Sequence, residues 1–218
     1  MKNTAAKLTL LPLFFCTLSH AAEKTVSVEP FTAVSAQQGI NLTVKCAATP
    51  SMVISGSQET MNKLRVSNNS GTLLLDNQAA ENDRFVSHTL DITLYTNHPL
   101  NALSGKAGVK IDVAACAVSP EQLTVTGSMG TDIRAEGKTN ELRLELAMGG
   151  TFNRKSTDFS AKSAAVRMSM GAESSLCNVP KITGTLAAGA RLAVSKSTDI
   201  DTGAASTFAS DISTSGCS

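Results

Sequence analysis

A repeat with a period close to twenty residues occupies the chain from residue 101 onward. Glycine follows Ala or Met at five places, and the intervals between these glycines are 22, 19, 22 and 18 residues: Ala107-Gly108, Met129-Gly130, Met148-Gly149, Met170-Gly171 and Ala188-Gly189. Apolar and polar residues alternate before each later glycine, and apolar residues return after it. Because alternation with period two is typical of β-strands, each repeat predicts a strand, a glycine corner and a second strand.

A single repeat of this kind cannot bury its apolar stripe, so successive repeats must stack. The period contains no amphipathic helix, and we therefore predict an all-β fold in which residues 101–218 form a parallel β-helix, or solenoid, with coils of about twenty residues. Equivalent positions in coils about 4.8 Å apart form columns. One inward column is expected to comprise Ala107, Met129, Met148, Met170 and Ala188. Glycine, which lacks a Cβ, should form the structural corners: Gly108, Gly130, Gly149, Gly171 and Gly189.

Residues 22–100 predict short β-strands and hairpins that lead into the β-helix. Alternating or β-branched apolar runs occur at 26–28, 40–44, 64–66, 72–75 and 90–94. Asn68-Asn69-Ser70-Gly71 separates two of these runs, and Asn and Gly accept the positive φ of a hairpin turn. We expect one continuous domain over residues 26–215.

The first 21 residues are typical of a signal peptide. Lys2 and Lys7 precede an apolar run, Leu8 to Leu18, and small residues end the segment at Ala21, after which we expect cleavage. The run is shorter than the about 20 residues of a membrane span. The chain is therefore expected to be exported without a membrane span, to the periplasm or to the cell surface. Cys16 could indicate a lipoprotein, but Phe14 and Phe15 occupy positions that usually carry small residues in lipid-attachment signals.

Four further cysteines, Cys46, Cys116, Cys177 and Cys217, predict two disulfides, because export places them in an oxidising compartment. Cys116 and Cys177 follow corners three coils apart, or about 14 Å along the stack. A disulfide needs Cα atoms within about 7 Å. That pairing is therefore disfavoured. We expect Cys46 to bond Cys116, which ties the first half to the opening coil, and Cys177 to bond Cys217, which pins the C-terminal end of the stack. No Cys-x-x-Cys pair or His at ligand spacing is present, and we expect neither a metal site nor a cofactor.

Charge and composition restrict the classes of partner. The 19 basic residues nearly balance the 18 acidic ones, which argues against nucleic acid or an anionic membrane as partner. Hydrophobic residues make up 42% of the chain, enough to build a core, but the chain has no Trp and a single Tyr, Tyr95. It therefore lacks the rings on which sugar-binding sites commonly stack their ligands.

The order of these elements resembles the GIN head domain of putative auto-transporter adhesins, a domain of unknown function. The resemblance rests on residues 31–34 leading to 39–44, 64–66 to 71–75, 90–95 to 99–100, and the glycine-centred repeats. Ser104-Gly105-Lys106-Ala107-Gly108 keeps the family's Ser-Gly form, whereas later repeats read Ser-Met-Gly. The resemblance implies an exported β-helical protein with an adhesive or envelope role, and it transfers no catalytic residue.

Enzymatic sites are the main alternative, since polysaccharide lyases and hydrolases on β-helices use carboxylates from adjacent coils. The candidates are Asp112, Asp132, Glu136, Glu145, Asp158 and Glu173. They lie at different offsets from their glycines, and only Asp132 and Glu173 share a column, two coils apart. We therefore expect solvated charges and no acidic cluster. Ser87, His88 and Asp91 include the residue types of a catalytic triad. Alternation places Ser87 and His88 on opposite faces, and no nucleophile elbow surrounds Ser87.

Two groups of residues carry atoms that bind metal ions. The thioethers of Met129, Met148, Met168 and Met170 are ligands that suit Cu(I), but Met at inward positions is more often core filler. Asp199, Asp201 and Asp211 could hold calcium, but they lack the glycine and third-ligand spacing of recognised loops.

Taken together, these features predict a non-enzymatic exported β-helical protein that binds glycan or an envelope protein, or has a structural role in the envelope. The alternative is a carbohydrate-active β-helix enzyme. The outward positions are polar and suit such a partner, for example Thr124, Thr126, Ser128, Arg143, Glu145, Arg167, Ser169 and Lys196.

Overall fold

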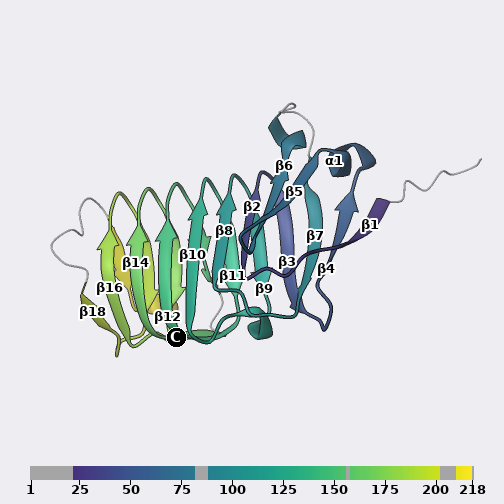
Figure 1. Ribbon diagram of the computed structural model, residues 1–218. Coiled ribbons are helices and arrows are strands. Elements are labelled where there is room, and N and C mark those ends of the chain that lie inside the picture. The colour runs from purple at the N-terminus through teal and green to yellow at the C-terminus, as the bar shows by residue number, and fades with distance from the viewer. Residues whose placement is uncertain (1–21, 82–87, 156–157, 202–209, 218) are drawn as a thin grey trace, which may run out of the picture.

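The computed structural model describes residues 22–81, 88–155, 158–201 and 210–217, and two long β-sheets pack face to face over them (Figure 1). Sheet A contains, in spatial order, β1 (Ala22–Ser27), β4 (Ser51–Gly56), β7 (Leu90–Thr96), β3 (Ile40–Cys46), β9 (Lys110–Val113), β11 (Asp132–Ala135), β13 (Thr151–Phe152), β15 (Glu173–Leu176), β17 (Arg191–Val194) and β19 (Asp211–Ser213). Sheet B contains β5 (Leu64–Asn69), β6 (Thr72–Asn77), β2 (Ala33–Gln37), β8 (Ala102–Lys106), β10 (Gln122–Ser128), β12 (Gly137–Leu146), β14 (Phe159–Met168), β16 (Lys181–Leu186) and β18 (Asp199–Asp201). The short helical segments are α1 (Gln58–Asn62), η1 (Gln78–Glu81), η2 (Ala115–Ala117) and η4 (Ser215–Cys217).

From β8 onward the chain forms the predicted parallel β-helix. Each coil runs up a strand of sheet B, turns at a corner, descends a strand of sheet A and returns to the next strand of sheet B (Figure 1). Ile111, Ile133, Phe152, Ser174 and Leu192 pair in register, so the coils advance by 22, 19, 22 and 18 residues, as the glycine intervals predicted. All strand pairs along this part are parallel.

The N-terminal half contributes coils of its own, and they do not follow chain order. β2 and β3 form a coil that lies between the coil of β6 and β7 and the coil of β8 and β9. Strands β1 and β4 on sheet A and β5 on sheet B then add antiparallel pairs at this end of the stack. The predicted hairpin turn joins β5 to β6, with positive φ at Ser70 and Gly71.

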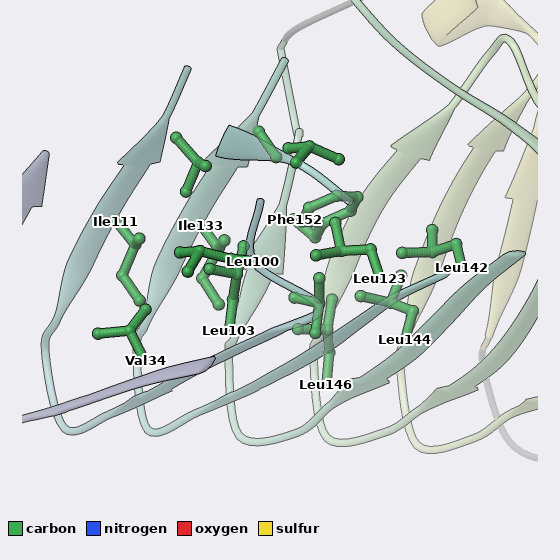
Figure 2. Close-up of a cluster of buried hydrophobic side chains, with 14 of the residues drawn as sticks. Val34, Leu100, Leu103, Ile111, Leu123, Ile133, Leu142, Leu144, Leu146 and Phe152 are labelled. Carbon is green, nitrogen blue, oxygen red and sulfur yellow. The ribbon is translucent and has the colours of Figure 1, made fainter. Parts of the chain in front are cut away.

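Aliphatic side chains fill the space between the sheets, and Figure 2 shows those of several successive coils. Val34, Leu103, Val125, Leu144 and Val166 pair in register and form one buried column of sheet B. A column of sheet A faces the same interior with Leu42, Ile111, Ile133 and Phe152. Burial of each such side chain stabilises the fold by about 1.5–3 kcal/mol, and the columns repeat that contribution coil after coil.

The five structural glycines lie between a strand of sheet B and the next strand of sheet A. Their φ values lie between 68° and 77°, a region that favours glycine. The inward column beside them was predicted wrongly, because Met129, Met148 and Met170 are 38%, 46% and 54% exposed. Each precedes its glycine with a φ of its own between 49° and 53°. The alternation of inward and outward side chains holds only within the strand and ends where this left-handed pair begins. Extending it into the corner assigns the Met side chain to the wrong face. Ala107 and Ala188 occupy the same corner position and are not buried either.

Both expected disulfides form. Cys46 bonds Cys116 with a Cα–Cα distance of 6.2 Å, and Cys177 bonds Cys217 at 5.3 Å. Each bond joins segments at the return side of the stack, which is opposite the glycine corners. The predicted signal peptide, residues 1–21, lies outside the described residues. Among the described residues, no helix is long and apolar enough to cross a membrane.

A charged groove on sheet A

The outward face of sheet A carries a row of polar residues that strand pairing places side by side: Asp91, Asn41, Lys110, Asp132, Thr151, Glu173, Arg191 and Asp211. Several contacts link neighbours in this row. Asn41 Nδ2 donates to Asp91 Oδ1 at 2.9 Å, and Thr151 Oγ1 donates to Asp132 Oδ1 at 2.6 Å. Glu173 accepts from Arg191 at 3.0 Å and from Arg154 at 3.2 Å. Such partly exposed ion pairs contribute about 0–1 kcal/mol each, so they orient side chains more than they stabilise the fold.

A depression of about 440 Å³ lies next to this row, across the ends of β3, β9 and β11. We call it the charged groove, and its charged lining residues are Lys45, Asp112, Arg134, Glu136, Lys155 and Asp158. Three bases and three acids therefore balance one another within it. A second depression, of about 280 Å³, shares Arg134 and Lys155 with the first and adds Asp132 and Arg154. The two together make an open, zwitterionic surface.

The groove exists because one coil departs from the regular pattern. Strand β13 ends after two residues, where Asn153 has a φ of 48° and is 1% exposed. Its side chain substitutes for the missing strand bonds: Asn153 Nδ2 donates to the Ala135 carbonyl at 3.0 Å, and Oδ1 accepts from the Ala135 N–H at 2.8 Å. The chain then leaves the sheet and contributes Lys155 and Asp158 to one wall of the groove.

The floor of the groove is made by small and apolar residues. Ala114 follows β9 and lies level with Lys45 and Glu136, as the backbone bonds from Ala114 N to Val44 O and from Glu136 N to Val113 O indicate. A methyl group between two long charged side chains leaves a hollow. Val44 and Val113 complete this lining.

Three of the six candidate carboxylates border one depression, which offset counting did not indicate. Asp112, Glu136 and Asp158 line the charged groove together, although they lie at different offsets from their glycines. Glu136 directly follows β11 and continues its register on β9, whereas Asp158 follows the return segment after β13 and directly precedes β14. The shared column of Asp132 and Glu173 is confirmed, with Thr151 between them. Glu145 lies on sheet B, where it pairs with Arg167 at 3.6 Å.

The single tyrosine borders this site. Tyr95 in β7 pairs with Lys45 in β3, and its half-buried side chain alternates with the buried Leu94 and Thr96. It therefore lies on the outward face of sheet A, one strand beyond the groove. The low count of aromatic residues argues against a ring on which a sugar could stack, but a count does not say where a single ring lies. Alternation along residues 90–96 could have indicated the face, but only the register of β7 against β3 places Tyr95 beside Lys45.

The other predicted sites do not assemble among the described residues. Asp91 accepts from Asn41, the His88 carbonyl accepts from Asn77 Nδ2 at 2.6 Å, and Ser87 lies outside the described part of the chain. Asp199 and Asp201 lie on sheet B, whereas Asp211 lies on sheet A, so the three carboxylates belong to opposite sheets. Over the ranges that the structure describes, no three His, Cys, Asp or Glu side chains are grouped to hold a metal ion.

The outward face of sheet B is polar and regular. Thr124 and Thr126 pair with Arg143 and Glu145, and these with Ala165 and Arg167. The side chains of β2, β8 and β10 on this face are mostly small. They are Ala, Ser and Thr, with longer Gln or Lys side chains at some strand ends. The two faces of the solenoid thus differ: sheet A carries the charged groove, and sheet B presents regular rows in which small polar residues are joined by Arg143, Glu145 and Arg167.

Residues 30–198 match the family described as "Putative auto-transporter adhesin, head GIN domain". The chain belongs to the GIN domain family. This confirms the resemblance found in the sequence, and the two disulfides together with the GIN family indicate an extracytoplasmic location.

Solved structures with the same fold include two proteins titled putative adhesins. One from Bacteroides fragilis has a TM-score of 0.61 and 12% identity, covering 84% of this GIN domain chain and 92% of its own. One from Parabacteroides merdae has a TM-score of 0.54 and 15% identity, covering 89% and 93%. At such identities the likeness concerns the fold alone. No curated protein is detectably similar to the chain in sequence.

Proposed function

We propose that this GIN domain protein is a non-enzymatic adhesin that binds a glycan in the charged groove of sheet A. The observation that carries the proposal is the groove itself: three bases and three carboxylates line one open hollow, with Tyr95 one strand away. The family description and the titles of the two similar structures support a role in adhesion.

The lining suits a ligand that is rich in hydroxyl groups and carries charge. Asp112, Glu136 and Asp158 can accept hydrogen bonds from sugar hydroxyls, while Lys45 and Arg134 can donate to sugar oxygens or to an anionic substituent. Bonds with one charged partner are roughly twice as strong as neutral ones. The Tyr95 ring offers an apolar face with a polar tip, which suits stacking against a sugar.

The scaffold also suits adhesion. Columns of buried aliphatic residues and two disulfides hold the groove on strands rather than on long loops, so binding requires little ordering of the protein. We further propose that residues 1–21 direct export and that the mature protein acts in the periplasm or at the cell surface. The positive start, apolar run and small residues before Ala22 support this part of the proposal.

A glycan array with the purified protein tests the glycan proposal. Tyr95→Ala and Arg134→Ala should each weaken binding of the best glycan by about tenfold, which corresponds to about 1.4 kcal/mol. Arg143→Ala is the matched control, because Arg143 is as exposed as Arg134 but lies on sheet B, so its affinity should not change. Equal loss in all three variants, or no binding to any glycan by a folded protein, would contradict the proposal.

One observation favours the enzymatic alternative, a carbohydrate-active β-helix protein. Asp112, Glu136 and Asp158 belong to neighbouring coils and line the same groove. Most enzymes that cleave glycosidic bonds use a pair of carboxylates as catalytic residues. Incubation of the protein with the glycans that it binds, followed by an assay for new chain ends, separates the two functions. New ends that disappear in Glu136→Gln or Asp158→Asn would establish the enzyme, whereas binding without cleavage supports the adhesin.

A further inference from the structure

Three methionines form an exposed line along one edge of the solenoid. Met129, Met148 and Met170, which we call the methionine ridge, are the first residues of three successive corners. Backbone bonds hold these corners in register: Gly130 N donates to Met148 O at 3.1 Å, and Gly149 N donates to Met170 O at 3.0 Å. The corners lie along the upper edge of the stack in Figure 1.

Core packing does not account for these methionines, since all three rank among the exposed large hydrophobic residues. Backbone preference does not account for them either. Their φ values of 53°, 49° and 52° lie in the left-handed region, which costs a non-glycine residue about 1–2 kcal/mol. Gln38, Ala107 and Ala188 occupy the same corner position in other coils, so the fold itself accepts other side chains there. Residues that are exposed and conformationally disfavoured point to a function.

The chemistry that the three residues share is the thioether. Adjacent coils are about 4.8 Å apart, and the three rotatable bonds of each Met side chain allow the outer two sulfurs to lean toward the middle one. Three converging thioethers form a soft trigonal ligand set, which selects Cu(I) and the similar ion Ag(I) over hard divalent cations. Methionines that fill a core are not available to bind copper. Because Met129, Met148 and Met170 are exposed, this objection does not apply to the ridge.

We propose that the methionine ridge binds one soft monovalent cation, Cu(I) or Ag(I). The ion exchanges its solvent ligands for three neutral sulfurs, and no electron is transferred. The cysteines of the described part of the chain are held in disulfides, so no thiolate there competes for the ion. Thioethers carry no proton to lose, unlike thiol and imidazole ligands. The affinity should therefore stay constant from acidic to neutral pH.

Titration of the full chain with silver nitrate tests the proposal without a reductant that would open the disulfides. Every sample carries Cys16→Ser, which removes the thiol outside the two disulfides. Calorimetry should give one Ag(I) per chain. With methyl-labelled methionine, the NMR signals of Met129, Met148 and Met170 should shift, while those of the buried Met52 and Met168 stay in place.

The decisive variant is the triple substitution Met129→Leu, Met148→Leu and Met170→Leu, which keeps the apolar bulk but removes the sulfurs. It should weaken Ag(I) binding by about a hundredfold or more, with an unchanged unfolding midpoint. Met168→Leu is the matched control and should bind as the parent does. Equal binding by the triple variant, or silver binding that shifts no ridge methyl signal, overturns the proposal. An apolar probe that binds parent and triple variant alike, with no silver bound, would instead identify the ridge as an apolar contact strip.

Discussion

The two edges of the solenoid turn the chain in different ways. At the corner edge, six turns from sheet B to sheet A use a left-handed residue followed by a left-handed glycine, from Gln38-Gly39 to Ala188-Gly189. The glycine N–H of the first five corners, from Gly39 to Gly171, donates to the neighbouring corner at 3.0–3.1 Å. At the return edge the connections differ in length and conformation, and side chains hold them: both disulfides, the helical turn η2 and the buried Asn153 lie there.

This difference shows where the fold restricts the side chain and where it does not. A corner that is held by backbone bonds and a glycine φ leaves its first residue open to choice, and Gln, Ala and Met all occur there. A return that is held by a cross-link or by a buried amide requires that particular residue. Substitutions should therefore cost more at the return edge than at the corner edge.

The largest effect is expected when the disulfide between Cys46 and Cys116 is removed by substituting both residues with Ser. The bond closes a span of 70 residues, and the loss of that constraint on the unfolded chain should lower the free energy of unfolding by about 4 kcal/mol. Denaturant unfolding monitored by circular dichroism measures the change. The double substitution of Cys177 and Cys217, which spans 40 residues at the end of the stack, should cost slightly less. An unchanged midpoint for the first pair would show that side-chain cross-links do not hold the return edge.

Asn153→Ala should have the next largest effect. It deprives the Ala135 N–H and carbonyl of their partners in a buried position, and an unsatisfied buried group costs about 1–3 kcal/mol. We expect a loss of about 3 kcal/mol and faster hydrogen exchange at the Ala135 amide. The exposed Asn140 offers the control, where Asn140→Ala should change stability by less than about 0.5 kcal/mol. A similar result for the two variants would mean that the Asn153 side chain does not replace the strand bonds.

A corner glycine should give the smallest effect. A Cβ at Gly149 would meet no atom within 4 Å, so Gly149→Ala carries only the conformational cost of a φ of 71°. That cost is about 1–2 kcal/mol. Gly149→Asn should cost less, because Asn tolerates the left-handed region better than Ala. Thermal unfolding of the two variants gives the comparison. A loss for Gly149→Ala that exceeds the loss for Asn153→Ala would reverse the proposed contrast between the edges.

The repetitive parts of the structure could be predicted because local chemistry repeats there. Alternation at residues 123–129 and 142–148, followed by glycine, predicts strand and corner from neighbouring residues alone. The spacing of Cys116 and Cys177 along the coils excluded one of the three possible pairings, and the disulfides follow one of the other two. The position of β2 and β3 between later coils could not be predicted in this way, because strand order depends on which distant backbone groups pair.

The candidate site was less accessible to such reasoning. The register of β11 on β9 places Asp112 and Glu136, but Asp158 lines the same groove after a coil in which Asn153 ends β13 early, an irregularity that a regular register does not contain. Strand alternation also predicted the wrong face for Met129, Met148 and Met170. Their left-handed backbone conformation turns the side chain outward instead of inward.

The sequence by itself thus determined the period, the positions of the corners and one excluded cysteine pairing, because each follows from local alternation, a glycine or a distance limit. Only the tertiary structure decided which surface residues share a groove and which edge the methionines occupy. Those arrangements depend on where the chain departs from its own repeat, and a departure becomes visible only when neighbouring coils are placed against it.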